Sequence, residues 1–345
     1  MAVKGYRELP DVPNQLKFTV ADPEGREIGF VKDSDLIDMD LGDTNDFEIQ
    51  FGTGVWEEKK YDWNHRIYIP DTEYGGLLEE RKTSTSADMI TWSGYTWRGL
   101  LGQKIIQPPS GKSHLIVSGD ANTIIKDVIG NRFGSLFVAD ADESGIKISN
   151  YQFDRYCTVL AGLEKMLAAK NARLKIYYVQ GTPGTAGGAV HVCAVPVTDW
   201  SEELEYSQDG KMDFTTKDFR RGTNHLICTG EGENEERLVL HLYVQKDGSI
   251  GDTKYYTGLK EREAVYDFTS ADMTELKEGG TERLLELMNY KQMEADVSGM
   301  DIDIWDIVGG RDRVTGMTLQ KPVVGKILKI QDGTVSVEYK LKGAE

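Results

Sequence analysis

The stretch TWRGLLGQKIIQPPSG, residues 96–111, separates two parts of the chain that have different sequence patterns. The residues before it, ADMITWSGYTW, alternate apolar and polar side chains as a β-strand does, and we expect the strand to run into this stretch. Pro108 and Pro109 cannot donate hydrogen bonds to a sheet, so any strand ends by about Gln107. We therefore predict a domain boundary near Ser110.

The residues before this boundary follow a strand pattern throughout. QLKFTVADPEGREI predicts two short strands around a Pro-Glu-Gly turn, and NDFEIQF and HRIYIP each alternate apolar and polar positions. Residues 1–110 are therefore predicted to form a β domain.

Residues 111–197 change to a mixed pattern. SGDANTIIKDVIGNRF predicts a helix with Asp120 as its N-cap, because its isoleucines and valine recur on one helical face. YQFDRYCTVLAGLEKMLAAKNARL predicts a second helix, and RLKIYYVQ and GAVHVCAVPV predict two strands around the glycine-rich loop GTPGTAGG. We expect a small α+β insert domain here.

Residues 198–345 return to strands. NHLICTGEG and ERLVLHLYVQKDGSIG alternate well, and PVVGKILKIQDGTVSVEYKL predicts a closing hairpin whose tight turn is Asp332-Gly333. The sequence thus has a β block, an α+β insert and a second β block, and these domains need not be continuous in sequence.

One helical segment, near 271–294, interrupts the last block. SADMTELKEGGTERLLELMNYKQMEAD can be capped by Asp272, with Glu275 three residues later. Gly279 and Gly280 are expected to split this segment into a short and a longer helix.

Length and charge limit the class of protein. At 345 residues the chain exceeds the roughly 250 to 300 residues of a single core, so two or three domains are expected. The net charge of −17 would repel a phosphate backbone, which argues against specific nucleic-acid binding. No apolar run approaches the roughly 20 residues of a membrane span, and MAVKGYRELPDVPNQ lacks the apolar core of a signal peptide. We expect a cytoplasmic product without a membrane anchor.

Neither the cysteines nor the histidines have the spacing of a metal site. The cysteines lie far apart and one of them must stay unpaired, so reduced thiols are expected. The histidines stand singly, without H-E-x-x-H spacing, and those within alternating strands are expected to pack or to face solvent. We predict no metal site and no cofactor. The residues concerned are Cys157, Cys193, Cys228, His65, His114, His191, His225 and His241.

Two fragments resemble ligand-binding loops but lack a required residue. PPSGKSH contains Gly-Lys-Ser, yet Ile106 stands where a phosphate-binding loop has its first glycine. DADESG, residues 140–145, begins like a calcium loop, but Tyr151 replaces the glutamate at the twelfth position. A solvated turn is the better interpretation of the second fragment.

Asp301 and Asp303, in MDIDIWD, are the only candidates for a catalytic pair. On one face of a strand they would lie about 7 Å apart, a separation that glycosidases use. Alternating charge on the wet face of a sheet explains them equally well, and no G-x-S-x-G motif is present. We predict no catalytic residue; loss of lytic activity in alanine variants of this pair would indicate a cell-wall hydrolase instead.

A carbohydrate- or receptor-binding module is the other alternative, and it rests on tryptophans. Packing in a core is the more frequent use of such side chains. The candidates are Trp56, Trp63, Trp92 and Trp97.

Three segments together resemble a known family. They are ADMITWSGYTWRGLLGQKIIQPPSGKSHLIVSGDANTIIKDVI, RRGTNHLICTGEGENEERLVLHLYVQKDGSIG and DIDIWDIVGGRDRVTGMTLQKPVVGKILKIQDGTVSVEYKLKG, spread over residues 85–343. In order and spacing they resemble the baseplate hub and tail-tip proteins of long-tailed phages, which also occur in prophages and phage-tail-like particles. The family often has glycine before Asp-Ile-Val, where this chain has Trp305.

The resemblance implies a structural protein without enzymatic activity, assembled in the bacterial cytoplasm and carried at the tip of a tail tube. Such a hub is a homotrimer with two β-barrel-like tube domains per chain. The six domains adapt the sixfold tube to a threefold spike or fibre. The implied partners are the tail tube protein, spike, fibre or distal tail proteins and the tape-measure protein. DNA would pass through the bore without specific binding.

The opening stretch gains a role in this arrangement. Trp97, Leu100 and Leu101 are expected to pack into the core of the first barrel, and the proline pair leads the chain out to the insert. Arg98 could form an ion pair between subunits, but we expect it to be exposed.

Overall fold

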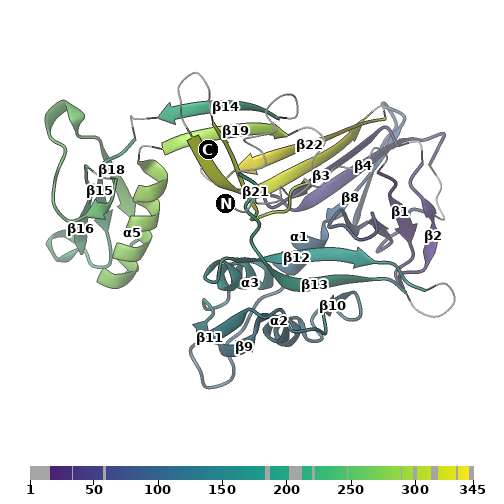
Figure 1. The fold of residues 1–345 in the computed structure, drawn as a ribbon, viewed down its shortest axis with the longest axis horizontal. Coiled ribbons are helices and arrows are strands. Elements are labelled where there is room, and N and C mark those ends of the chain that lie inside the picture. Colours follow the sequence, from purple (N-terminus) through teal and green to yellow (C-terminus); the bar gives the residue numbers. More distant parts are fainter. Residues whose placement is uncertain are drawn as a thin grey trace, which may run out of the picture. The chain divides into compact units, whose positions relative to one another are not determined.

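Strands dominate the computed structural model, which confirms a mainly β protein with an α+β part (Figure 1). The chain divides into two compact units. Unit 1 takes the described residues of Met1–Asp213, Ala295–Arg311 and Gln320–Lys342, and unit 2 those of Phe214–Glu294 and Asp312–Leu319. The structure describes residues 16–32, 34–56, 60–182, 187–201, 212–219, 222–246, 248–288, 290–297, 301–311, 318–331 and 333–341.

The largest sheet of unit 1 joins strands from both ends of the chain. Its order is β22-β21-β3-β4-β8-β7, with every neighbouring pair antiparallel. The predicted closing hairpin is confirmed: Gln331 pairs with Thr334 across the turn, although Asp332 lies outside the described residues. The bounds are β3 Leu36–Leu41, β4 Asp46–Gly52, β7 Glu80–Ser84, β8 Met89–Tyr95, β21 Thr318–Gln331 and β22 Thr334–Leu341.

Three more strands, β20, β19 and β14, adjoin this sheet, and β14 lies next to β19. β20 (Ile307–Arg311) pairs with β21, and β19 (Tyr290–Val297) pairs with β22. The chain passes from unit 1 into unit 2 within β14 (Met212–Phe219) and returns within β19. The units therefore do not share the predicted boundaries at 110 and 197, and the segment 198–345 contributes to both of them.

A second, smaller sheet of unit 1 has the order β2-β1-β5-β6. The antiparallel β1 and β2 are the two strands predicted around the Pro-Glu-Gly turn. The bounds are β1 Thr19–Ala21, β2 Glu27–Phe30, β5 Arg66–Tyr68 and β6 Gly75–Leu77.

The strand predicted to continue into the opening stretch ends at Tyr95, and a short helix follows. The Thr96 side chain accepts a hydrogen bond from the Gly99 N–H and caps α1 (Trp97–Gly102). Trp97 and Leu101 are fully buried, so this turn of helix places both on the core. The prediction that the strand runs into this stretch was wrong, because the cap at Thr96 and the burial of Trp97 and Leu101 favour a helical turn here.

The α+β insert contains both predicted helices and the predicted hairpin. β12 and β13 pair antiparallel, β10 adds to β13 in parallel, and β9 pairs with β11. Residues 183–186 of the glycine loop lie outside the described residues. The bounds are β9 Ile116–Asp120, α2 Ala121–Ile129, β10 Phe137–Ala139, β11 Lys147–Gln152, α3 Val159–Ala168, β12 Ala172–Val179 and β13 Ala189–Pro196.

The insert shares its core with the β part of unit 1. Trp97 stacks on Tyr178 of β12 with ring centroids 5.5 Å apart, and Tyr178 stacks on Tyr68 of β5 at 3.8 Å. Leu101 belongs to the same cluster of buried side chains. Trp97 and Leu101 therefore pack against the insert as well as the β part, rather than into a barrel core of their own, and Leu100 is only partly buried.

Asp120 is the N-cap of α2, as predicted, and it also holds a neighbouring turn. Its carboxylate accepts hydrogen bonds from the N–H groups of Asn122 at 2.9 Å, Ser144 at 3.0 Å and Gly145 at 3.0 Å. Burial alone would raise the pKa of Asp120, but these donors, Ser144 above all, hold it below its ordinary value.

Asp120→Ala is expected to lower the free energy of unfolding by about 2 kcal/mol, because a cap and further N–H groups lose their acceptor. The contribution of ionised Asp120 is complete above the ordinary pKa of aspartate, about 3.9, and is lost as the pH falls through the lower folded value. Urea unfolding at pH 7 and pH 3 measures both effects. Asp154→Ala, which removes an exposed ion pair with Lys165, should change stability by less than about 0.5 kcal/mol.

The described residues of unit 2 include a four-stranded sheet with an α-helix packed on it. The sheet order is β17-β16-β15-β18, and β15 and β18 run parallel. Leu276 and Leu284 of the helix are buried with Leu226, Cys228 and Leu242 of the sheet. The bounds are β15 His225–Thr229, η1 Asn234–Glu236, β16 Val239–Val244, β17 Ile250–Gly251, η2 Gly258–Lys260, β18 Glu263–Asp267 and α5 Met273–Leu287.

Helix α5 is continuous through the two glycines that were expected to split it. The predicted capping box of Asp272 and Glu275 is confirmed. Gly280 faces the sheet so closely that a Cβ there would lie 2.5 Å from the Cys228 Sγ. Glycine is thus used for a close approach of helix to sheet, and tertiary packing outweighs its poor helix propensity.

Gly280→Ala is expected to lower the free energy of unfolding by about 1–3 kcal/mol, because overpacking against Cys228 outweighs the better helix propensity of alanine. Gly279→Ala is the matched control. Its Cβ would lie 2.8 Å from the Tyr266 hydroxyl and 3.5 Å from two carbons of that ring, so a small shift of one partly buried side chain relieves the contact, and stability should stay equal or rise slightly. Thermal unfolding of both variants measures the difference. Equal losses of stability would contradict the close approach of Gly280 to the sheet.

Among the described residues, no helix is both long and apolar enough to cross a membrane. Cys157, Cys193 and Cys228 are free thiols, as predicted. Burial raises the pKa of Cys228 to about 11, so this thiol stays protonated near neutral pH.

Candidate functional site

Asp301 and Asp303 do not lie on a strand: residues 301–306 form an irregular segment with a turn before β20. The Asp301 Oδ1 accepts hydrogen bonds from the Tyr74 hydroxyl at 2.7 Å and from the Lys326 Nζ at 2.9 Å. The same Nζ lies 3.9 Å from the Asp303 Oδ1. A buried lysine thus lies between the two carboxylates. The prediction that Asp301 and Asp303 share one face of a strand was wrong.

Arg173 of β12 links the same segment to the insert. Its Nη2 donates to the Asp303 Oδ2 at 2.7 Å and its Nε donates to the Asp306 Oδ1 at 2.7 Å. Asp306 also accepts from the Thr198 N–H at 2.8 Å and from the Trp200 Nε1 at 3.3 Å. These contacts tie the segment to β12 and to the chain that leaves the insert.

The charges around Asp303 determine its ionisation. Burial alone would raise the pKa of Asp303, but the charges of Lys326 and Arg173 hold it below the ordinary value. A glycosidase general acid needs the opposite, a raised pKa that keeps its proton near neutral pH. The geometry and the charge of this pair therefore fit ion pairing better than acid catalysis.

Arg98 is buried, with 1% of its side chain exposed, so the prediction of an exposed arginine was wrong. Its Nε and Nη2 donate to the two oxygens of Glu73 at 2.6 and 3.1 Å, and its Nη1 donates to the Glu164 Oε1 at 2.5 Å. Burial would lower the pKa of Arg98, but Glu73 and Glu164 hold it above its ordinary value. The guanidinium therefore joins the β part to α3 of the insert within one chain.

Trp305 has a left-handed backbone, with φ of 75°, at the position where the resembled family often has glycine. Its indole Nε1 donates to the Glu164 Oε1 at 3.0 Å, and the same oxygen accepts a hydrogen bond from the Arg98 Nη1. The large ring is accommodated because it joins this hydrogen-bond network.

A pair of variants separates the backbone strain at Trp305 from the contact of its side chain. Trp305→Gly and Trp305→Ala both lose the indole, but only alanine keeps the penalty for positive φ. The glycine variant is therefore expected to be about 1 kcal/mol more stable than the alanine variant. Denaturant unfolding of the two measures the difference, and equal stability would contradict backbone strain here.

These contacts make one network, which we call the ionic junction. It joins three parts of unit 1 that are distant in sequence: the β part before residue 110, the insert, and the segment that leads into the C-terminal strands. Because its carboxylates face lysine or arginine, the network can fix these parts relative to one another. The ionic junction comprises Glu73, Tyr74, Arg98, Glu164, Arg173, Asp301, Asp303, Trp305, Asp306 and Lys326.

Three of the four tryptophan candidates gather around one arginine, whereas Trp97 stacks on Tyr178. The Arg81 guanidinium carbon lies 5.6 Å from the Trp56 ring, 5.7 Å from Trp63 and 5.6 Å from Trp92. Trp92 is fully buried, and Trp63 has 47% of its surface exposed. A sugar-stacking surface needs open ring faces, whereas all three rings face Arg81, and Trp63 and Trp92 also pack edge to face.

The fragment that began like a calcium loop is used for internal hydrogen bonds. The Asp140 carboxylate lies 2.9 Å from the Nδ1 of His191 and accepts from the Tyr177 hydroxyl. Ser144 and Gly145 donate instead to Asp120. The loop is a turn held against β12, β13 and α2.

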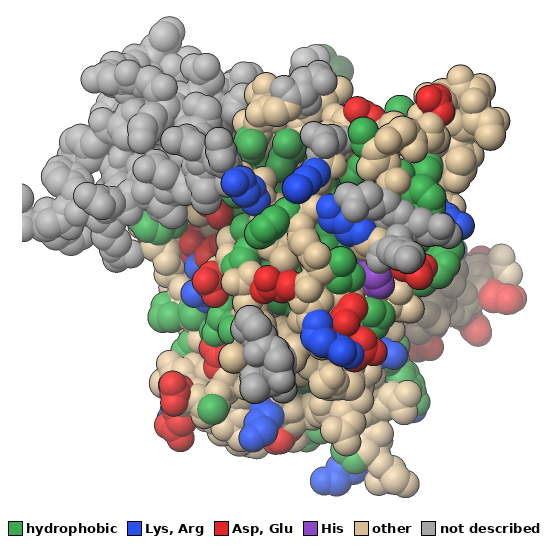
Figure 2. All heavy atoms as spheres, turned by 90° about the vertical axis from the view of Figure 1, so that its right-hand side faces the viewer, with side chains coloured by type: hydrophobic (Ala, Val, Ile, Leu, Met, Phe, Trp, Pro, Cys, Tyr) green, Lys and Arg blue, Asp and Glu red, His purple; other side chains and the backbone are tan. Residues whose placement is uncertain are grey.

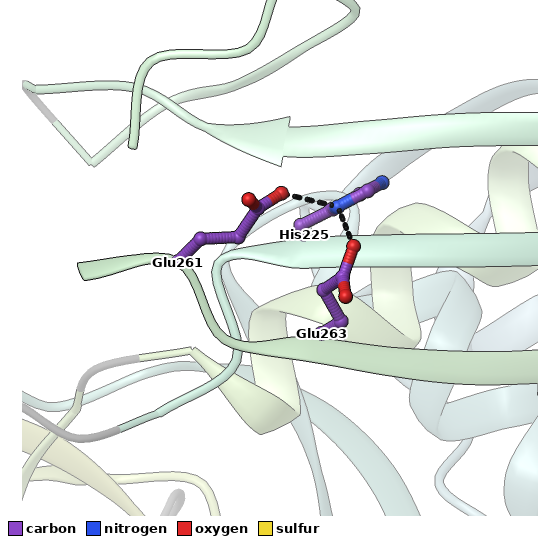
Figure 3. A group of neighbouring side chains, drawn as sticks. All are labelled: His225, Glu261 and Glu263. Atoms are coloured by element: carbon purple, nitrogen blue, oxygen red, sulfur yellow. Dashed lines mark hydrogen bonds and ion pairs between the residues drawn. The ribbon is translucent and has the colours of Figure 1, made fainter. Parts of the chain in front are cut away.

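One cluster of side chains, in unit 2, was not predicted from the sequence. The Nδ1 of His225 lies 2.8 Å from the Glu261 Oε1 and 3.0 Å from the Glu263 Oε1, as Figure 3 shows. The Nε2 of His225 lies 2.8 Å from the Nδ1 of His241, and the Lys254 Nζ lies 2.6 Å from the Glu261 Oε1. The alternation of Glu261 and Glu263 was the available signal, but only the parallel pairing of β15 and β18 brings it to His225. We call His225, Glu261 and Glu263 the histidine cluster.

Among solved structures, one phage tail protein matches nearly the whole chain. The 43 kDa tail protein of prophage MuSo2 from Shewanella oneidensis matches with a TM-score of 0.52 at 13% identity, over 94% of this chain and 98% of that one. This chain has the fold of a phage tail protein. The resemblance drawn from the sequence motifs is thereby confirmed at the level of the fold.

Two further tail proteins match at lower scores. The tail protein from Neisseria meningitidis MC58 has a TM-score of 0.48 at 12% identity, over 94% of this chain and 96% of that one. The prophage tail protein gp18 from Listeria monocytogenes EGD-e has a TM-score of 0.48 at 13% identity, over 94% of both chains. No protein-family model matches the sequence, and no curated protein matches it.

Proposed function

We propose that this protein is a structural hub of a phage or phage-like tail, without enzymatic activity. The observation that carries the proposal is the shared fold with a prophage tail protein, which extends over 94% of this chain. In the hub arrangement the chain forms a trimeric ring at the tip of the tail tube. Two tube-like β domains from each chain, which draw their strands from both 1–110 and 198–345, then adapt the sixfold tube to a threefold spike or fibre.

The ionic junction supports a structural role. A hub has to keep its shape while neighbours bind on several sides, and buried ion pairs with good geometry hold packed parts in one arrangement. Arg98, Arg173 and Lys326 each contact carboxylates from another part of unit 1. The proposed neighbours are the tail tube protein, spike, fibre or distal tail proteins and the tape-measure protein. The proposed location is the tail tip of the particle.

The alternatives have weaker support. The hydrolase hypothesis rests on Asp301 and Asp303, whose carboxylates are engaged by Lys326, Arg173 and Tyr74. The receptor-binding hypothesis rests on tryptophans that are buried or stacked with Arg81. On the face drawn in Figure 2, hydrophobic side chains occur in small groups among acidic and basic ones, which does not single out a sugar platform.

The mass in solution tests the hub directly. Light scattering on a sizing column, at several protein and salt concentrations, should give a mass near three times 38.6 kDa. Electron microscopy of that species should then show rings with a central bore. A chain that keeps its monomer mass at every concentration contradicts a self-assembling trimeric hub. Lytic activity that disappears in Asp301→Ala or Asp303→Ala would favour the hydrolase instead.

A further inference from the structure

We propose that the histidine cluster of unit 2 binds one divalent transition-metal ion of the zinc class. The His225 Nδ1 and one carboxylate oxygen from each of Glu261 and Glu263 all lie within 4.8 Å of one another (Figure 3). One imidazole nitrogen with two carboxylate oxygens is a donor set that Zn²⁺ accepts, and the remaining position is left for water.

The backbone holds these ligands in place before any ion arrives. Parallel pairing sets His225 of β15 directly opposite Glu263 of β18, so both side chains leave the same face of the sheet. The Asn224 side chain donates to the Lys260 carbonyl at 2.8 Å and accepts from the Arg262 N–H at 2.9 Å. These two bonds fix the turn that carries Glu261, so the cluster does not depend on a mobile loop.

His241 provides the support that a metal-binding histidine usually has. Its Nδ1 lies 2.8 Å from the His225 Nε2, so one proton is shared between the two rings. When His225 donates that proton to His241, its own Nδ1 carries a lone pair directed at the two glutamates. This is the tautomer that binds a metal, with the second ring nitrogen fixed by a hydrogen bond. The Tyr243 ring, stacked on His225 at 4.4 Å, holds the plane of the imidazole.

The charges of the site favour a cation. With neutral histidines, the two carboxylates and Lys254 leave one negative charge in excess beside a side chain, His225, that is only 6% exposed. A single hydrogen on Nδ1 lies in one direction and cannot point at both glutamate oxygens, at 2.8 and 3.0 Å. One divalent ion among the three atoms would satisfy both carboxylates; a proton on Nδ1 is the competing occupant.

Lys254 allows a second test, in which the expected change in metal affinity has the opposite sign. Its ammonium lies 2.6 Å from the Glu261 oxygen and competes with a metal for that ligand. With 42% of its side chain exposed, it can move into solvent when an ion binds. Removing Lys254 should therefore strengthen metal binding, whereas removing a glutamate should weaken it.

The experiment is a titration of the full chain after treatment with EDTA and dialysis. Calorimetry follows Zn²⁺, and visible absorption follows Co²⁺ as a probe of the ligand geometry. We expect one equivalent to bind to the wild type, at least about tenfold weaker binding to Glu263→Gln, and tighter binding to Lys254→Met. Glu263 is half-exposed, so this variant should keep the thermal midpoint of the metal-free wild type.

Asp267→Asn is the matched control. Asp267 leaves the same strand on the same face as Glu263, but it pairs with Arg237 instead of the histidine cluster. Its variant should bind Zn²⁺ as the wild type does. If the wild type shows no saturable Zn²⁺ binding, or binds it no better than Glu263→Gln, a proton alone occupies the cluster and the proposal is overturned.

Discussion

Arg98→Met is expected to lower the free energy of unfolding by about 3–5 kcal/mol, the largest loss of any single substitution considered for this chain. Methionine keeps much of the side-chain volume but removes the charge, so the buried Glu73 loses the guanidinium that pairs with it. Glu164 loses one of its two donors and keeps the Trp305 indole. Denaturant unfolding followed by tryptophan fluorescence measures the loss.

Two further variants make this result specific. Arg98→Met combined with Glu73→Gln should recover part of the stability, because the uncompensated buried charge is gone. Arg26→Ala, which breaks exposed ion pairs with Asp22 and Glu24, should cost less than about 0.5 kcal/mol. If Arg98→Met changes stability as little as Arg26→Ala does, the ionic junction does not hold the insert against the β part.

Lys326→Met is expected to have the second largest effect, a loss of about 3 kcal/mol at pH 7. The lysine is 1% exposed and lies between Asp301 and Asp303, which would repel each other without it. It also lies 4.7 Å from the Tyr74 ring, so a cation–π contact disappears as well. Burial would lower the pKa of Lys326, but Tyr74, Asp301 and Asp303 hold it above its ordinary value, and the side chain stays charged.

The loss in Lys326→Met should depend on pH with a definite sign. In the wild type the pKa of Asp303 is lowered, so its stabilisation is complete above the ordinary value of about 3.9 and disappears as the pH falls through the folded value. The variant loses the part of this stabilisation that Lys326 supplies and keeps the part that Arg173 supplies. The difference between the two proteins is therefore widest above about pH 4 and narrows in stronger acid. A difference that grows in acid would contradict the ion pairing described for Lys326.

Features that depend on a few neighbouring residues were predictable from the sequence. The caps at Asp120 and Asp272 and the turn at Gly333 use local hydrogen bonds or a single positive φ. The N-cap at Thr96 is also a local signal and could have revealed the helix that follows it. The helix has only six residues, however, and these show too little helical periodicity to be distinguished from a strand. The continuity of α5 could not be found, since only Cys228, on another element, explains Gly280.

The charged sites depend on partners that the sequence does not bring together. From the sequence alone Arg98 is predicted to be exposed, because nothing in the sequence shows that Glu73 and Glu164 lie beside it. The sequence predicts that Asp301 and Asp303 form a candidate catalytic pair, because it does not show that Lys326 and Arg173 lie beside them. The histidine cluster needs the register of two parallel strands, and a parallel register has no turn that could reveal it.

The pairing of β21 with β3 has a consequence for how the protein is made. The strand that covers one edge of β3 is translated only after the whole insert and the long segment Phe214–Glu294 of unit 2. At about 5–20 residues per second, that edge of the nascent chain stays open for tens of seconds on the ribosome. Open edges pair readily with strands of other chains, so yield in cells should depend on how well chaperones protect this edge until the last hairpin emerges.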